Sequence, residues 1–263
     1  MKNIPEDNLA YPGLIKLATN EGSGFRLNSG SKIYFITAKH VLFSKDGTLK
    51  ALEATVFCQT KSTRSGKLTS YHIDLGYLQT TGNLFFHKDR DVAAFVIENV
   101  SLEKNKKHFT AQTIPGVSLL KAQTSATVNV AKSSVSFIAD VCIANDVYLY
   151  GYPSSLSLRE SPQFDYNVPL LRKGIIAGLN RKKGTLILDC PVYPGNSGGP
   201  IIEVRKHPQG DIHYVVGVVS QFVPYETKWV NSGNNLSNSN WENSGYSVAV
   251  AMDAVFEMLN IKV

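Results

Sequence analysis

The sequence predicts an all-β fold, and three observations support this class. Glycine occurs 20 times, and tyrosine and phenylalanine 12 times each; aromatic residues favour strands and glycine favours the turns between them. Short apolar segments recur along the chain with turn residues between them, which is the pattern of a β-sandwich or barrel. Only residues 251–260 have helical periodicity. With 263 residues and 43% hydrophobic content, the chain can bury the core of one large domain or two small ones.

Taken in order along the chain, the first two strands are expected on either side of an NSGS turn within residues 24–42. The polar stretch 231–240 is predicted to be a mobile surface loop. Asp253 is the expected N-cap of the helix over 251–260. Further strands are expected within residues 51–60, 70–79, 91–100, 125–134, 146–153, 184–193, 199–206 and 212–222.

Charge and cysteine content exclude several classes of protein. The 27 basic and 21 acidic residues give a net charge of +6, scattered in short runs such as 181–183, and no nucleic-acid-binding motif accompanies them. No apolar run reaches the length of about 18 residues that a membrane helix needs, and the N-terminal residues lack a signal-peptide pattern. Cys58, Cys142 and Cys190 are an odd number without a disulfide framework. We therefore expect a cytoplasmic protein that binds neither nucleic acid nor membrane.

A glycine-rich stretch, YPGNSGGP at residues 193–200, frames a single serine, Ser197. Glycine adopts positive φ and permits close backbone approach, so the stretch predicts a tight turn that presents the hydroxyl beside uncovered N–H groups. This is the geometry of a nucleophile next to an oxyanion site. An ordinary loop between two strands can have the same composition, so the interpretation needs a base and an acid elsewhere in the chain.

Two residues could supply that base and acid. His40 follows an apolar strand directly, and Asp91 lies where a charged loop enters another apolar strand. Nucleophilic catalysis by serine needs a neutral imidazole to take the hydroxyl proton and a carboxylate to orient that imidazole. We therefore expect His40, Asp91 and Ser197 to form a catalytic triad.

Neighbouring residues offer alternatives. Asp89 could replace Asp91 as the orienting acid, although Asp91 adjoins the apolar segment that would shield it. His87, Asp89 and Asp91 alternate and could form a metal patch, but no cysteine or third histidine motif joins them, so no metal and no cofactor are expected. Cys190 could act as a thiol nucleophile, but it lacks the glycine frame and is expected to be a buried structural cysteine.

Together, these motifs resemble those of the chymotrypsin-like, or trypsin-like, serine peptidases. The segments VYLYGYP, GIIAGL and GYSVAVAMDAV are similar to the bacterial HtrA-like branch of that family, although no PDZ-like module is expected after the C-terminal helix. The resemblance rests mainly on GSGF at 22–25, TAKH at 37–40, DVAAF at 91–95, GNSGGP at 195–200 and GVVS at 217–220.

The resemblance implies two six-stranded antiparallel β-barrels with the site between them and a short C-terminal helix. Residues 1–110 would form the barrel that carries the histidine and the aspartate. Residues 111–140 would connect the barrels, and residues 141–263 would form the barrel with the nucleophile and the helix.

The family's roles carry over residue by residue. Ser197 would attack the scissile carbonyl, His40 would act as base and then as acid, and Asp91 would orient the imidazolium. The backbone N–H groups of Gly195 and Ser197 would form the oxyanion hole. The expected activity is that of a serine endopeptidase acting on protein or peptide substrates through an acyl-enzyme.

The family comparison also suggests the substrate pocket, which would be formed by Pro191, Tyr193, Ser220, Gln221 and Phe222. Pro191 stands where trypsins carry the aspartate that binds a basic P1 side chain. Val219 stands where glutamyl endopeptidases carry a histidine. We therefore expect cleavage after small or medium uncharged residues.

Asn196 stands where zymogens of the family carry the aspartate that pairs with a newly freed N-terminus. Its neutral amide could not neutralise a buried ammonium, so activation by N-terminal cleavage is not expected. Regulation would act through a partner protein, the substrate or oligomerisation, with residues 154–169 and 231–244 as the segments expected to move.

Three other functions remain as alternatives. A catalytically silent form of the fold could serve as a protein-binding module. An acyl hydrolase of the α/β type is disfavoured because that fold places histidine last and alternates strands with helices. A nucleic-acid-binding barrel would have only the basic charge to support it.

Overall fold

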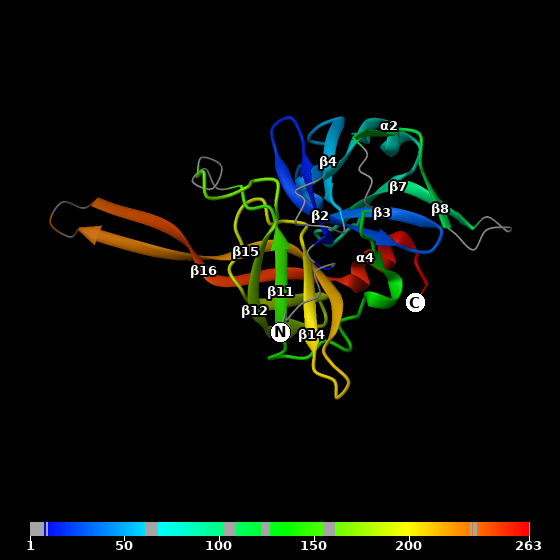
Figure 1. The fold of residues 1–263 in the computed structure, drawn as a ribbon. Coiled ribbons are helices and arrows are strands. Elements are labelled where there is room, and N and C mark those ends of the chain that lie inside the picture. Colours follow the sequence, from blue (N-terminus) through cyan, green and yellow to red (C-terminus); the bar gives the residue numbers. More distant parts are fainter. Residues whose placement is uncertain are drawn as a thin grey trace.

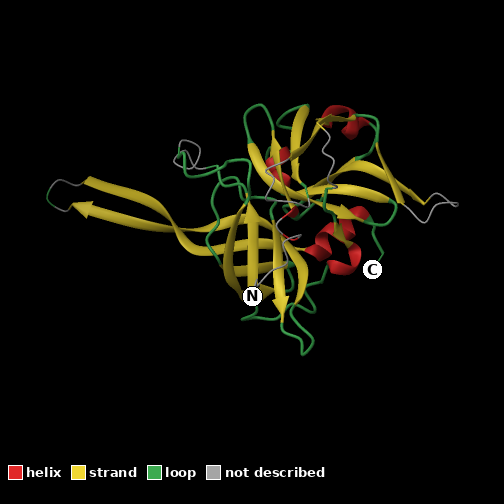
Figure 2. Ribbon diagram, viewed as in Figure 1, coloured by secondary structure: helices red, strands yellow, loops and turns green. Residues whose placement is uncertain are grey.

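The computed structural model describes residues 8, 10–60, 68–102, 109–121, 127–154, 161–231, 233 and 236–262. These residues form two barrel-like β halves with few helices (Figure 1), and Figure 2 shows how strands dominate both halves. None of the helices in the described ranges is long and apolar enough to span a membrane. The all-β class and the C-terminal helix are confirmed.

The N-terminal half is a ten-stranded sheet with the order β6-β7-β3-β2-β1-β4-β5-β9, in which β8 pairs with β7 and β10 pairs with β2. Two short helices, α1 (Lys39–Leu42) and α2 (Leu75–Thr80), interrupt it. Its strands are β1 (Pro12–Lys16), β2 (Glu21–Asn28), β3 (Lys32–Thr37), β4 (Glu53–Gln59), β5 (Leu68–Asp74), β6 (Leu84–Phe86), β7 (Ala93–Leu102), β8 (Phe109–Thr113), β9 (Val117–Lys121) and β10 (Val130–Ala131).

The C-terminal half is a closed barrel with the order β11-β12-β13-β16-β15-β14, which confirms the six antiparallel strands expected for it. The 3₁₀ turn η3 (Lys132–Ser134) precedes this half, and α4 (Met252–Leu259) follows it. Its strands are β11 (Asp146–Gly151), β12 (Leu170–Asn180), β13 (Thr185–Asp189), β14 (Pro200–Arg205), β15 (Ile212–Asn231) and β16 (Leu236–Ala251).

The first half differs from the six-stranded barrel expected for it. Within the described residues its strands follow an open path, and ten strands take part. The additional pairing arises because β8 and β9 add to the edges of β7 and β5, and β10 runs parallel to β2. This sheet therefore extends to Ala131, past the boundary expected at residue 110 and into the segment expected to connect the two barrels.

Side-chain hydrogen bonds explain two further differences. Residues 75–79 were expected to continue a strand but belong to α2, because the Asp74 carboxylate accepts the Tyr77 N–H at 2.8 Å and caps a helix there. Asp253 does not cap α4, whose N-cap is Ala251. Its carboxylate instead accepts the backbone N–H of Ile138 at 2.9 Å, so it ties the helix to the inter-barrel connection.

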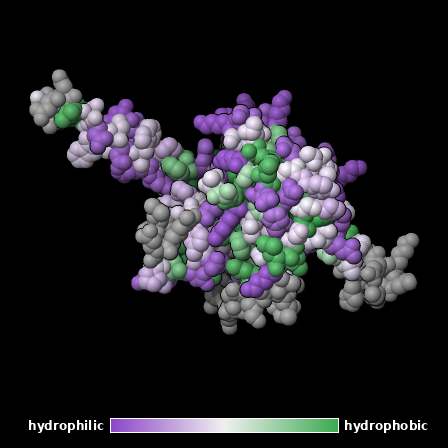
Figure 3. Space-filling view, turned by 90° about the horizontal axis from the view of Figure 1, so that it is seen from above, coloured by the Kyte–Doolittle hydropathy of each residue, from purple (hydrophilic) through white to green (hydrophobic). Residues whose placement is uncertain are grey.

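The predicted loop over 231–240 is wrong, because its described residues complete a two-stranded arm. β15 and β16 stay paired from Pro224 with Asn243 to Asn231 with Leu236, and the arm projects from the barrel (Figure 1) and stands clear of the body in Figure 3. Polar residues can form such an arm because the two strands are joined by backbone hydrogen bonds, which do not require the side chains to be buried. Residues 232, 234 and 235, and residues 155–160 of the other segment expected to move, lie outside the described part of the chain.

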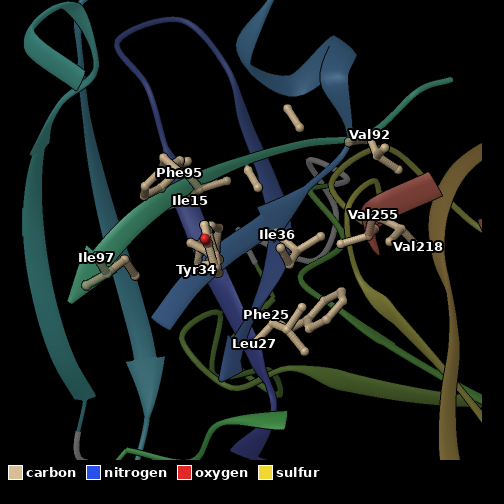
Figure 4. Packing of buried hydrophobic residues seen from close by; sticks show 14 of the residues in the cluster. Ile15, Phe25, Leu27, Tyr34, Ile36, Val92, Phe95, Ile97, Val218 and Val255 are labelled. Atoms are coloured by element: carbon tan, nitrogen blue, oxygen red, sulfur yellow. The ribbon is translucent and has the colours of Figure 1, made fainter. Parts of the chain in front are cut away.

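The two halves share one apolar cluster. Phe25, Phe35 and Phe95 are fully buried within the first sheet, and Val218 of β15 and Val255 of α4 belong to the same cluster. Figure 4 shows Val218 and Val255 beside Ile36 and Val92. This packing fixes the position of one half against the other, which matters because the candidate catalytic residues come from both.

Candidate active site

Antiparallel pairing brings His40 and Asp91 together although they are far apart in sequence. β3 pairs with β7 so that Thr37 lies opposite Ala93. His40 follows the end of β3 in α1, and Asp91 precedes the start of β7. Since the two strands run in opposite directions, the residues just after one lie beside the residues just before the other.

The Asp91 carboxylate holds the imidazole of His40 through both of its oxygens. Oδ2 lies 2.7 Å from His40 Nδ1, and Oδ1 accepts the backbone N–H of His40 at 2.9 Å. The Ser220 hydroxyl donates to Oδ2 at 2.5 Å. With Nδ1 as the donor to Asp91, the other ring nitrogen, Nε2, is left as an acceptor, as a general base requires.

These contacts also set the charge state of Asp91. Burial acts to raise its pKa, but the hydrogen bond and charge of His40, together with the Ser220 hydroxyl, outweigh burial and bring the pKa below its ordinary value. Asp91 is therefore an anion at neutral pH, ready to stabilise an imidazolium.

The C-terminal half contributes Ser197 to the same site. The preceding Gly195 has a φ of +90°, and a Cβ there would lie 2.2 Å from the Tyr152 carbonyl oxygen, so only glycine fits this turn. Ser197 Oγ donates to the backbone carbonyl of Ser220 at 3.2 Å. Ser197 and His40 line one hollow of about 860 Å³, but the described contacts include no hydrogen bond between them.

The backbone N–H groups of Gly195 and Ser197 are candidates for an oxyanion hole. The Pro194 carbonyl accepts the Ser154 N–H at 2.8 Å. Because a trans peptide points its C=O and N–H in opposite directions, the Gly195 N–H points away from Ser154. Neither this N–H nor that of Ser197 has a hydrogen-bond partner among the described residues. Both can therefore bind an oxygen of a substrate.

The neutral side chain of Asn196 helps to close the turn over residues 193–199, which we call the Ser197 turn. Asn196 is buried, its backbone N–H donates to the Tyr193 carbonyl at 3.0 Å, and its Oδ1 accepts the Tyr193 N–H at 3.0 Å. The turn is thus closed by local hydrogen bonds that need no ammonium group.

Sequence reasoning missed Ser23 as a residue of the site. Its hydroxyl, fully buried on β2, donates to the Gly195 carbonyl at 2.6 Å and accepts the Tyr152 N–H at 2.9 Å, and its backbone N–H donates to the Ser197 carbonyl at 2.8 Å. Ser23 therefore anchors the Ser197 turn to the N-terminal half. The only sequence signal was its place in GSGF, which indicated family membership rather than this contact.

The hollow next to Ser197 includes most of the predicted pocket residues. Tyr193, Ser220, Gln221 and Phe222 line it, whereas Pro191 does not. The Arg172 guanidinium lies 4.5 Å from the Tyr193 ring centroid, where it makes a cation–π contact with that ring. Other apolar lining comes from Val192, Val248 and Val250.

The neighbouring alternatives are placed differently. Asp89 is exposed, and its described hydrogen bond runs from its backbone N–H to His87 Nδ1 at 3.0 Å, not to His40. His87 Nε2 faces Glu257 at 3.5 Å. In the described ranges no three His, Cys, Asp or Glu side chains gather closely enough to hold a metal ion. Cys190 is fully buried, which raises its pKa to about 11 and opposes thiolate chemistry.

Several solved structures are similar to this fold. Deg5 matches at 14% identity over 98% of this chain and 93% of that chain, with a TM-score of 0.54. The thermostable serine protease AL20 from an extremophilic microorganism matches at 13% identity over 97% of both chains, with a TM-score of 0.54. A mutant of human heparin binding protein matches at 10% identity over 97% and 91%, also with a TM-score of 0.54. At such identities the likeness shows the fold alone.

Sequence comparison gives the family. No curated protein matches the chain. A family model described as "Trypsin-like peptidase domain" matches residues 22–210, which is well over half of the sequence. The chain therefore belongs to the trypsin-like peptidase family.

Proposed function

We propose that this protein is a serine endopeptidase in which Ser197, His40 and Asp91 act as a catalytic triad. The observation that carries the proposal is that these three side chains, from two halves of the fold, converge on one hollow beside two unpartnered N–H groups. Each role has a matching contact or opening, so the arrangement can perform acyl transfer without a metal or a cofactor.

The chemistry follows from the contacts. As Ser197 Oγ bonds to the scissile carbonyl carbon, its proton moves to His40 Nε2, and Asp91 stabilises the resulting imidazolium. The carbonyl oxygen becomes an oxyanion that the N–H groups of Gly195 and Ser197 can bind, each donor lowering the barrier by about 3 kcal/mol. The C–N bond then breaks, and the leaving amine takes the proton from His40. Water, deprotonated by His40, hydrolyses the acyl-enzyme in the same way.

The hydrogen bond from the Ser197 hydroxyl to the Ser220 carbonyl is compatible with this proposal. A nucleophile and its base often form their hydrogen bond only when the substrate is bound. Rotation of the Ser197 side chain about one bond would move its hydroxyl from the Ser220 carbonyl towards His40, and both residues already line the same hollow.

The proposed P1 residue is small or medium and uncharged. Tyr193 and Phe222 narrow the hollow with half-exposed rings, and Val192, Val248 and Val250 add apolar surface. The substrate would be a protein or peptide, and a reducing, cytoplasmic setting would suit the free thiols of Cys58, Cys142 and Cys190. Regulation through a partner protein belongs to the same proposal, because the neutral turn at Asn196 has no counter-charge for a freed N-terminus.

A catalytically silent binding module is the second candidate. It is favoured by the absence of a described hydrogen bond between Ser197 and His40, and a protein named for heparin binding shares the fold. Two measurements separate the candidates. A fluorophosphonate reagent should modify Ser197, as seen by peptide mass mapping, and a peptide library should be cleaved; a protein that reacts with neither reagent nor peptides would favour the binding module over the peptidase.

A further inference from the structure

Basic side chains line two hollows that residues of the candidate triad also line. At one part of the 860 Å³ hollow the lining is formed by Arg90 with Lys182 and Lys183 of the turn between β12 and β13. A second hollow, of about 550 Å³, shares His40 and Asp91 with the first and is also lined by Arg90. Its other basic residues are Lys39, Lys45, Lys50 and Lys88. We call these seven side chains the cationic rim.

Hydrogen bonds leave the charge of the cationic rim in place. Lys39 Nζ donates to the His87 carbonyl at 3.1 Å, and Lys50 Nζ donates to the His40 carbonyl at 2.5 Å. Arg90 Nη2 lies 3.4 Å from the Lys182 carbonyl. Each acceptor is a neutral backbone group, and the ion pairs found among the described residues involve none of the seven.

Few acidic groups oppose these charges. Two carboxylates line the hollows, those of Asp89 and Asp91. Asp91 is engaged by His40, so Asp89 is the remaining acid against seven basic side chains. The chain as a whole carries a net charge of only +6, which means that positive charge is concentrated where the triad lies.

We propose that the cationic rim selects polypeptide substrates with acidic residues flanking the scissile bond, while the P1 residue itself is uncharged. The inference rests on the proposed peptidase function and names its substrate class. An extended substrate advances about 3.3 Å per residue, so residues within a few positions of P1 would reach the hollows that the rim lines. A cleft lined by one sign of charge concentrates ligands of the opposite sign and accelerates their association, typically by tenfold or more at low salt.

A single-stranded nucleic acid is the other polyanion that such a rim could attract. The peptide is favoured because the rim encloses a nucleophile, a base and an oxyanion site, which together act on carbonyl carbon. Phosphate binding would use only the basic side chains of the rim and would leave the nucleophile, the base and the oxyanion site without a role.

The test compares three peptides with the same uncharged P1 residue and acidic, neutral or basic flanks. The acidic peptide should have the highest kcat/KM, by about tenfold over the neutral one, with the difference mainly in KM. In about 1 M NaCl, where the Debye length falls to about 3 Å, the preference should shrink to near unity.

Two double variants assign the preference to its residues. Lys182→Ala with Lys183→Ala should lower the ratio of acidic to neutral kcat/KM several-fold. The matched control, Lys121→Ala with Lys262→Ala, removes the same charge from exposed positions outside both hollows and should leave that ratio unchanged.

Several outcomes overturn the inference. They are equal cleavage of the three peptides, an acidic preference that the Lys182 and Lys183 changes leave intact, and rim-dependent binding of an oligonucleotide without any preference among peptides. Failure of the underlying function looks different, because then no peptide is cleaved and a fluorophosphonate leaves Ser197 unmodified.

Discussion

The two halves of the molecule contribute to the site in different ways. The N-terminal half supplies His40 and Asp91, which side-chain hydrogen bonds hold in one arrangement. The C-terminal half supplies Ser197 and its N–H groups through the shape of a backbone turn that depends on Gly195. The first half should therefore be sensitive to the chemical identity of its side chains, and the second also to any added backbone bulk.

Two serine hydroxyls link the halves at the candidate site. Ser23 on β2 is hydrogen-bonded to the Ser197 turn, and Ser220 on β15 is hydrogen-bonded to Asp91. Each half thus sends one serine hydroxyl to the other half's functional group. A site divided in this way depends on the relative position of the halves, which the shared apolar cluster fixes.

The largest effect is expected when either half loses its reacting group. Ser197→Ala and His40→Ala should each lower kcat by about 10⁶-fold, because the residues act as one unit. Both side chains face the hollow rather than the core, so the free energy of unfolding should change by less than about 1 kcal/mol. Peptide hydrolysis and urea denaturation measure the two quantities. Clear residual turnover in purified Ser197→Ala would remove Ser197 from its role.

A smaller effect is expected from the orienting acid. Asp91→Asn keeps the shape of the side chain but favours the wrong imidazole tautomer, and kcat should fall by about 10⁴-fold. Asp89→Asn is the matched change two residues away and should alter kcat by less than about tenfold, since Asp89 does not contact His40. If Asp89→Asn lowers kcat more than Asp91→Asn does, Asp89 is the orienting acid.

The backbone of the second half is tested by Gly195→Ala. The added Cβ would meet the Tyr152 carbonyl, displace the Gly195 N–H and lower kcat by about 10²- to 10³-fold with KM little changed. Gly82→Ala is the control, because Gly82 also has a positive φ, +69°, but has open space around it. That variant should lose about 1 kcal/mol of stability and keep its kcat. Equal losses of activity in both would mean that strain alone, not the oxyanion site, is responsible.

The smallest effect concerns the link from Ser220 to Asp91. Ser220→Ala removes a donor that lowers the Asp91 pKa, so that pKa should rise towards its ordinary value of 3.8. A carboxylate whose pKa is lowered in the folded state stabilises the fold at pH values above its ordinary pKa. This contribution disappears as the pH falls through the folded-state pKa. The variant should therefore be less stable than the wild type by about 1 kcal/mol at neutral pH.

Urea denaturation at several pH values checks this expectation. The difference between the wild type and Ser220→Ala should shrink as the pH falls below 3.8. A difference that stays constant across this range would indicate a packing effect rather than an interaction with ionised Asp91.

Some of this arrangement was predictable because it is encoded locally. The glycines around Ser197 and the apolar strands next to His40 and Asp91 lie within a few residues of the groups they position. The roles of Ser23 and the cationic rim were not predictable, because the interacting residues come from distant segments. Residues 181–183 read as an isolated basic run, and only folding places two of its lysines in a hollow with His40.

The arm shows a different limit of sequence reasoning. The part of β16 that lies in the arm consists mostly of polar residues, a composition that favours a loop. Pairing with β15 satisfies its backbone, and the partner strand was expected to end at residue 222. Composition could not reveal that β15 continues to Asn231.

The most direct test of a triad assembled across the two halves uses a peptidyl chloromethyl ketone with a small uncharged P1 residue. Such a reagent first engages the serine as a carbonyl and then alkylates the histidine, so it reports both halves in one product. Peptide mass mapping should find a single adduct on His40 in the wild-type protein. Ser197→Ala and Asp91→Asn should form it far more slowly. Adduct on His40 at an unchanged rate in Ser197→Ala, or adduct on a cysteine alone, would contradict a triad built from these residues.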